Sequence, residues 1–235
     1  MPRRPRIIVP QIPLHIIQRG NNRQCCFFND QDYQTYLNWL VEYSDITDCL
    51  VHAYVLMPNH VHLLLTPANT NSAGDLMKRL GQRYVQYVNR SYKRSGTLWE
   101  GRFRSCVIEQ ETYLFNCQRY IEMNPVRAGI VQHPDEYRWS SYHVNGLGVK
   151  SNLISHHILY QTLGKTMSEK LKAYKALFQH EIEIEELDRI REATNGNFSL
   201  GNEQFQKEIS TRLGRRVTRG SPGRPRKKKL GENKE

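Results

Sequence analysis

Two histidines separated by one residue, His60 and His62, are the first side chains of this sequence that could do chemistry together. They follow Met57-Pro58-Asn59, a hairpin-like break, and open an apolar run that predicts a strand. Side chains at positions i and i+2 of a strand point to the same face, so both imidazoles could chelate one divalent ion while Val61 packs into the core. Polar histidines at a strand end are the alternative, since short motifs also arise by chance.

Tyr120 is a second candidate, because it lies at the edge of the apolar face of a helix predicted over 111–123. Most helical tyrosines pack their ring and hydrogen-bond their hydroxyl, which is the alternative reading. Asn124 follows one turn later, before a proline that ends the helix. Its amide could serve as a neutral oxygen ligand or as a helix-ending cap, and the sequence leaves both open.

The segment 99–105 interleaves aromatic and basic residues, namely Trp99, Arg102, Phe103 and Arg104. Such a segment could bind single-stranded or hairpin DNA, with bases stacking on the rings and guanidinium groups contacting phosphate. It could equally be a strand with both aromatic rings in the core and both arginines in solvent. Alternation alone does not separate the two.

The net charge of +11 is concentrated near the end of the sequence. Nine basic residues and no acidic one lie between Arg212 and Lys229, and the other 25 basic residues nearly balance the 23 acidic ones. We therefore expect this tail to attract a polyanion. Arg224 and Arg226 stand in a Gly-Arg-Pro context that resembles an AT-hook, although nonspecific attraction to phosphate is the favoured reading.

The elements that must position these residues are predicted in the order strand, helix, strand, strand, helix, strand, helix. The strands are expected over 13–19, 50–56, 61–65 and 98–108, and the helices over 30–41, 73–92 and 111–123. This order is typical of a split βαβ unit, so we predict an α+β fold: a ferredoxin-like or RRM-like antiparallel sheet with helices on one face. The long helices argue against a β-sandwich.

Three parts of the chain are expected. Residues 1–150 should form the domain that holds the candidate site. Residues 151–213 look wholly helical and could be a second DNA-binding module or a helical cap, and residues 214–235 should be a disordered basic tail.

Cysteine usage and hydropathy predict the compartment. The five cysteines include no CxxC pair, and their odd number suits neither a disulfide framework nor a thiolate zinc site. No run of about 18 apolar residues occurs. We expect a cytoplasmic, nucleoid-associated protein with no membrane partner.

Three runs in one order, 54–65 (YVLMPNHVHLLL), 98–103 (LWEGRF) and 119–129 (RYIEMNPVRAG), resemble the IS200-like single-tyrosine transposases of the HUH endonuclease superfamily. The resemblance covers about residues 13–141 and is closest to the branch of REP-associated tyrosine transposases, which act on palindromic repeats. It implies that His60 and His62 bind the metal, that Tyr120 is the nucleophile, and that Asn124 matches a third ligand. The wider family often has glutamine at that last position.

The same resemblance implies a 5′-phosphotyrosine and a free 3′-hydroxyl as products of cleavage, and it raises Arg127 as a contact to DNA phosphate. A divalent ion would neutralise charge developing on the phosphate, and a mixed nitrogen and oxygen site suits Mg²⁺ or Mn²⁺. A tyrosine phosphoester would preserve the energy of the broken link, so the DNA could be rejoined without ATP.

Two other classes of function remain open at this stage. The first is a catalytically silent DNA-binding or regulatory protein derived from a transposase. The second is a structural zinc protein, which would unfold on chelation. Monomer and homodimer are both compatible with the sequence.

Overall fold

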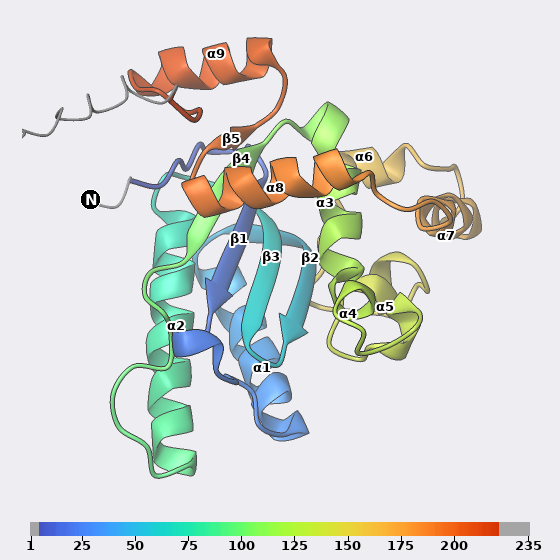
Figure 1. Ribbon diagram of the computed structural model, residues 1–235. Coiled ribbons are helices and arrows are strands. Elements are labelled where there is room, and N and C mark those ends of the chain that lie inside the picture. Colours follow the sequence, from blue (N-terminus) through green and yellow to red (C-terminus); the bar gives the residue numbers. More distant parts are fainter. Residues whose placement is uncertain (1–4, 221–235) are drawn as a thin grey trace, which may run out of the picture.

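A mixed five-stranded sheet forms the centre of the protein, in the strand order β2-β3-β1-β4-β5 (Figure 1). The computed structural model describes residues 5–220. The strands are β1 (Leu14–Arg19), β2 (Cys49–Met57), β3 (His60–Pro67), β4 (Arg104–Ile108) and β5 (Ser199–Leu200). All neighbouring pairs are antiparallel except β4 and β5, which run parallel. The predicted α+β class is confirmed, with a mixed sheet in place of a purely antiparallel one.

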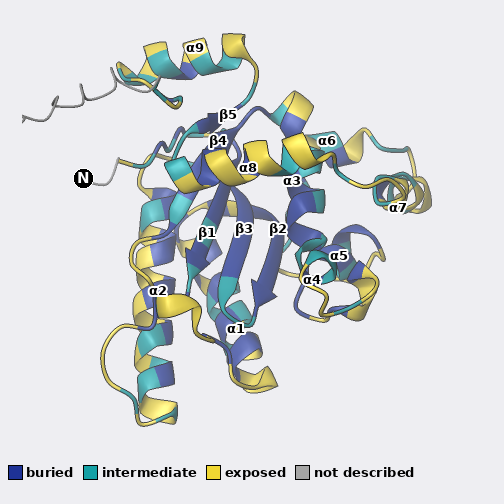
Figure 2. Ribbon diagram, viewed as in Figure 1, coloured by how far each residue is buried: buried dark blue, intermediate teal, exposed yellow. Residues whose placement is uncertain are grey.

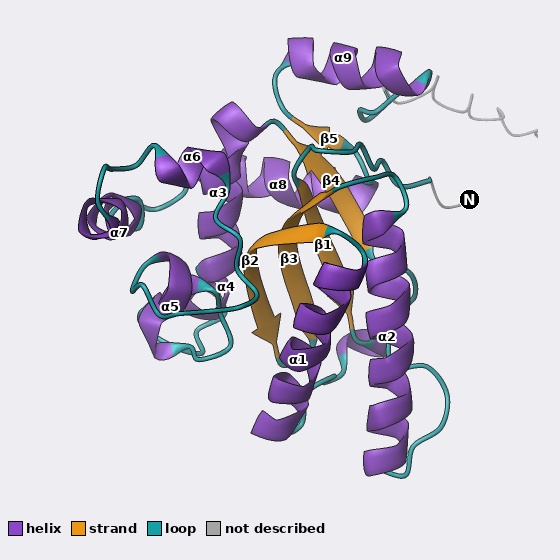
Figure 3. Ribbon diagram, turned by 180° about the vertical axis from the view of Figure 1, so that it is seen from behind, coloured by secondary structure: helices purple, strands orange, loops and turns teal. Residues whose placement is uncertain are grey.

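One face of the sheet is covered by α1 (Asp30–Ile46) and α2 (Ser72–Ser91), which lie side by side in front of the strands in Figure 3. A capping box starts α1, because the side chain of Asn29 accepts from Asp32 N and the Asp32 carboxylate accepts from Asn29 N. The N-cap of α1 is therefore Asn29. Tyr36 and Tyr84 meet edge to face beneath these helices.

The other face is covered by α3 (Gln110–Glu122), which packs on β2 and β3, and by α8 (Ile184–Gly196), which crosses in front of the strands in Figure 1. Helices thus cover both faces, whereas the sequence pattern predicted helices on one face. The physical reason is the composition of β2 and β3, in which nearly every residue is buried (Figure 2). Strands that are apolar on both sides require cover on both sides.

The predicted strand over 98–108 is too long, since β4 begins only at Arg104. Gly101 precedes it with φ +140°, a conformation that side chains rarely allow, and this residue interrupts the extended run. Trp99 still forms an isolated bridge with Gly20.

Short elements connect and follow these layers. They are η1 (Asn21–Arg23), α4 (Asn124–Arg127), η2 (Pro134–Glu136), α5 (Tyr142–Asn145), α6 (Ile158–Gln161), α7 (Met167–Ala176) and α9 (Glu203–Leu213). In the part of the chain that the structure describes, no helix is long and apolar enough to cross a membrane.

The region after residue 150 was expected to be wholly helical, but it also contains the strand β5. β5 pairs with β4, and α8 packs on the sheet, so both belong to the same layers as the strands of the first part. The division into parts at 150/151 and 213/214 stays a prediction. Arg224 and Arg226 lie outside the described residues.

Candidate active site

The two histidines of the 60–62 triplet project from the start of β3 toward the face covered by α3 and α8. His60 pairs with Arg19 of β1, and His62 pairs with Ile17, so both imidazoles lie on one side of the strand. Their ring centroids are 5.0 Å apart and their planes are nearly perpendicular. Val61 is fully buried, as predicted. This arrangement allows both rings to reach one small ion.

Hydrogen bonds engage the Nδ1 atom of each ring. His60 Nδ1 lies 2.6 Å from Oδ1 of Asn59, and His62 Nδ1 lies 2.8 Å from Nε2 of His15 on β1. Burial lowers the pKa of His60 to about 4, with a further contribution from the charge of Arg19. Burial also lowers the pKa of His62 well below its usual value. Both rings are therefore neutral, which is the state that binds metal.

Tyr120 lies beside this pair. The centroid of its ring is 5.7 Å from that of His62 and 5.7 Å from that of His15, edge to face in both cases. The side chain is only 7% exposed. Burial raises the pKa of the phenol, while the charges of Arg127 and Arg191 and a hydrogen bond from Arg191 oppose that increase. The structure thus brings the phenol of Tyr120 next to the imidazole of His62.

Asn124 begins α4 one residue after α3 has ended, and its side chain interacts with His60, where it opposes the lowering of the imidazole pKa. Because an amide carries both a donor and an acceptor, the same group can offer its oxygen to an ion next to that ring. The break between α3 and α4 at Met123 thus places Asn124 at the histidine pair.

Arg127, at the end of α4, packs against the candidate nucleophile. Its guanidinium carbon is 4.5 Å from the centroid of the Tyr120 ring, and its Nη2 donates to the carbonyl oxygen of Tyr120 at 2.5 Å. Its Nη1 is buried and has no hydrogen-bond partner among the described residues. Burial lowers the pKa of Arg127 to about 10, so the group remains charged at neutral pH. A positively charged side chain with an unpaired N–H donor beside a phenol can bind an anionic oxygen.

The donors at this site fit a catalytic metal site better than a closed structural one. Because both Nδ1 atoms are engaged, the Nε2 atoms of His60 and His62 would be the ones to bind an ion, and the Asn124 amide would be the adjacent oxygen donor. Within residues 5–220, no three His, Cys, Asp or Glu side chains form a group that could hold an ion. An ion here would keep positions for water or substrate, as a catalytic metal does.

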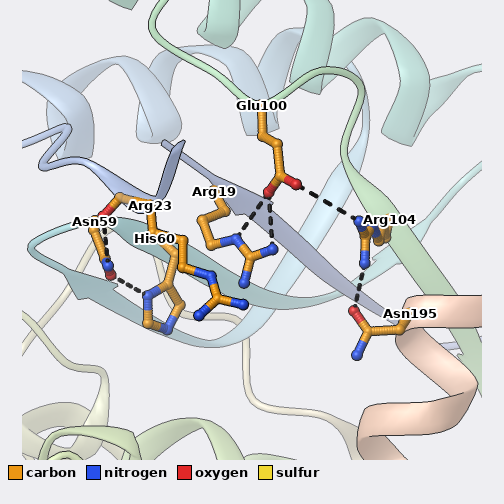
Figure 4. Close-up of polar contacts among 7 residues, drawn as sticks. All are labelled: Arg19, Arg23, Asn59, His60, Glu100, Arg104 and Asn195. Atoms are coloured by element: carbon orange, nitrogen blue, oxygen red, sulfur yellow. Dashed lines mark hydrogen bonds and ion pairs between the residues drawn. The ribbon is translucent and has the colours of Figure 1, made fainter. Parts of the chain in front are cut away.

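A hollow of about 890 Å³ opens between the ends of β1 and α8, and its wall includes Arg19, the strand partner of His60. Arg19 is the strand partner of His60, and Glu100 lies between Arg19 and Arg104 (Figure 4). Arg104 also donates to Oδ1 of Asn195 on α8. The arginine side chains that line the hollow are Arg6, Arg19, Arg102, Arg104 and Arg219. They outnumber its two carboxylates, Glu100 and Glu192, so the hollow favours an anion.

The structure separates the interleaved residues of the 99–105 segment. The Trp99 and Phe103 side chains are 6% exposed each, Trp99 next to the ring of Tyr84 and Phe103 beneath the guanidinium of Arg6. Arg102 is exposed and Arg104 is half-buried. The aromatic rings therefore lie in the core, and contact of the two arginines with phosphate stays a prediction.

Sequence reasoning passed over the residues that α8 and β1 add to the site. Arg191 and Thr194 come from α8, and His15 comes from β1. The signal that could have found His15 is its place as a polar residue within the run Leu14 to Ile17, because a buried polar side chain needs a partner. Nothing in the pattern of α8 singles out its two residues.

Residues 8–124 match the family described as "Transposase IS200 like". A protein of Haemophilus influenzae described as a REP-associated tyrosine transposase is 28% identical over 101 residues, which are 39% of this chain and 57% of that protein. The chain therefore spans a little over half the length of this curated relative.

Among solved structures, a REP-associated tyrosine transposase bound to a REP hairpin has a TM-score of 0.52 and 17% identity, covering 67% of this chain and 93% of that one. A protein of Deinococcus radiodurans described as a transposase has a TM-score of 0.36 and 21% identity, covering 52% and 96%. The first of these shares the fold. The matched residues include both histidines of the pair, Tyr120 and Asn124, and the chain belongs to the IS200-like transposase family.

Proposed function

We propose that the protein cleaves and rejoins single-stranded DNA by forming a covalent bond between Tyr120 and a DNA phosphate. The observation that carries this proposal is the position of the Tyr120 ring, 5.7 Å from the ring of His62 by centroids. A nucleophile must lie close to the groups that stabilise the phosphate it attacks. Family membership supports the same chemistry.

The cleavage step exchanges one phosphoester for another. The Tyr120 hydroxyl gives up its proton and its oxygen attacks phosphorus, while the bond from phosphorus to the 3′ oxygen breaks. The 3′ oxygen leaves as a hydroxyl after taking up a proton, and the 5′ end stays on the protein as a phosphotyrosine. Attack by a 3′-hydroxyl on that phosphotyrosine reverses the exchange and restores both the DNA and the phenol.

A divalent ion, for which we propose Mg²⁺ or Mn²⁺, would supply charge neutralisation at the phosphate when bound. His60, His62 and Asn124 are the residues that would hold it. The neutral state of both imidazoles supports this assignment, since a protonated ring could not be a ligand.

Arg127 is proposed to contact the attacked phosphate. Its guanidinium already lies over the Tyr120 ring, and the buried Nη1 has a donor to offer. The arginine-lined hollow between the ends of β1 and α8 provides a path for the rest of the strand, with Arg102 and Arg104 on its wall. Contacts of this kind position a strand without reading its sequence.

The substrate proposed is a hairpin-forming single strand of the palindromic-repeat type. Support comes from the related structure, which is described as bound to a REP hairpin. We place the activity in the cytoplasm, at the nucleoid, and assign it to a monomer or a homodimer.

The test is incubation of the full chain with labelled hairpin DNA and Mg²⁺ or Mn²⁺, followed by denaturing electrophoresis. A labelled protein band is expected, and it should be absent with Tyr120→Phe. The matched control is Tyr113→Phe, another largely buried tyrosine of α3, which should retain the band. Binding of hairpin DNA without any metal-dependent band would instead favour a silent DNA-binding protein.

A further inference from the structure

A buried chain of hydrogen bonds runs from α8 through β1 to the candidate metal ligand His62. The hydroxyl of Thr194 donates to the carbonyl oxygen of Ile190 at 2.8 Å, as threonines within helices commonly do. Oγ1 of Thr194 also lies 2.9 Å from Nδ1 of His15, and Nε2 of His15 lies 2.8 Å from Nδ1 of His62. All of these groups are buried, so water does not compete for them.

Strand register brings the participants together. His15 pairs with Cys106 across β1 and β4, so both side chains point toward α8, and Cys106 Sγ lies 3.2 Å from Oγ1 of Thr194. His15 and His62 project from the same face of neighbouring strands, and their rings are inclined by only 15°. The three elements thus hold the rings in one fixed orientation.

The positions of the hydrogens follow from the first bond of the chain. A hydroxyl has one hydrogen, and that of Thr194 is used on Ile190, so its oxygen accepts from Nδ1–H of His15. Nε2 of His15 then carries no hydrogen and accepts from Nδ1–H of His62. The remaining nitrogen of His62, Nε2, is left with its lone pair, which is the form that binds a metal.

We propose that Thr194 and His15 are positioning residues that hold His62 in the Nδ1–H tautomer and so prepare its Nε2 for the metal. This inference rests on the proposed function in taking His62 as a ligand. It also assigns a role in the site to α8, a helix that follows the residues matching the family. The reverse order of hydrogens, with Thr194 donating to His15, would place a hydrogen on Nε2 of His62 and block it.

The first experiment reads the tautomers in the metal-free full chain, by two-bond ¹H–¹⁵N correlation NMR of the imidazoles. We expect His62 as the Nδ1–H form and His15 likewise. Thr194→Val, which removes the hydroxyl and keeps the shape, should give a mixture of both forms at His62. Thr194→Ser should restore the single form.

The matched control is Thr66→Val. Thr66 Oγ1 lies 2.8 Å from Nε2 of His52, another buried threonine–histidine contact that does not lead to His62. This variant should leave the tautomer of His62 unchanged. A general loss of packing would affect both valine variants alike.

The second experiment measures Mn²⁺ affinity by calorimetry without DNA. Loss of an outer partner of a metal ligand weakens binding by about 10- to 100-fold, and we expect this for Thr194→Val but not for Thr194→Ser or Thr66→Val. The inference is overturned if His62 of the unaltered protein carries its hydrogen on Nε2, or if Thr194→Val changes neither tautomer nor affinity. Neither measurement uses DNA cleavage, so a failure here is distinct from a failure of the Tyr120 assignment.

Discussion

In the proposed reaction the phenol of Tyr120 loses its proton when it attacks DNA, although burial raises the pKa of this phenol. The largest effect that opposes this rise in pKa comes from Arg127, whose guanidinium lies over the Tyr120 ring. A positive neighbour favours the phenolate because it stabilises negative charge in a poorly solvated place. Arg127 therefore acts on the nucleophile as well as offering a donor to phosphate.

Replacing Arg127 with methionine should shift the pH–rate profile of adduct formation to higher pH. Loss of an adjacent opposite charge moves a pKa by about one unit or more, so at neutral pH the rate should fall roughly tenfold. Single-turnover kinetics on hairpin DNA across pH would measure this. Arg127→Lys keeps the charge, so its pH–rate profile should stay close to that of the unaltered protein. An unshifted profile for the methionine variant would refute the role.

At the scale of elements, a buried carboxylate connects α3, the helix that carries Tyr120, to later parts of the chain through hydrogen bonds. Glu122, in the last turn of α3, accepts hydrogen bonds from Ser141 at 2.6 Å, from Asn145 of α5 at 2.9 Å and from Tyr174 of α7 at 2.9 Å. Burial raises the pKa of Glu122 from 4.5 to about 7, although these three donors oppose the shift. The joint thus holds α3 in place next to the site.

Because the pKa of Glu122 is higher in the folded protein than in the unfolded chain, its contribution to stability is present below pH 4.5 and is lost as pH rises through about 7. The unfolded chain releases the proton first, and the difference amounts to at most about 3 kcal/mol. Urea unfolding at several pH values should show this slope. Glu122→Gln should flatten it, and Glu111→Gln, an exposed change on α3, should leave it intact; equal slopes in all three proteins would contradict the account.

Elements with a clear period could be predicted from the sequence, and so could the site residues that they carry. The 60–62 triplet and Tyr120 lie on a strand and a helix whose spacing fixes their faces. The role of Thr194 could not be predicted, because its partner His15 lies 179 residues away and the helix pattern records no such contact. The burial of Trp99 and Phe103 was equally undecided, since alternation does not tell which face of a strand meets a core.

At the scale of the whole molecule, the net positive charge is concentrated near the end of the sequence. The body near the site has its own arginines, but the densest basic run, 224–229, follows the last described residue. Attraction of DNA by this tail and chemistry at the sheet are therefore separable properties. Counterion release makes the first strongly dependent on salt.

Truncation after Gly220 should weaken binding of hairpin DNA and lower its salt dependence. Five basic residues of the run 224–229 are lost, and each phosphate contact to a single strand contributes about 0.7 to the slope of log K against log salt, so the slope should fall by roughly 3.5. Fluorescence anisotropy at several salt concentrations measures this. A tail with the same composition in scrambled order should restore the slope. If the scrambled tail leaves binding to A·T-rich DNA weak, the Gly-Arg-Pro motif is favoured instead. No change in binding on truncation would exclude the tail from DNA binding.

The most direct test of the central claim is to map the covalent adduct. The chain has 13 tyrosines, so the site of attachment is informative. After reaction with hairpin DNA and Mn²⁺, digestion with nuclease and protease and mass spectrometry should find the 5′-phosphonucleotide on the peptide that contains Tyr120, and on none when the metal is chelated. Attachment to a different tyrosine, or equal attachment in the presence of chelator, would contradict the account.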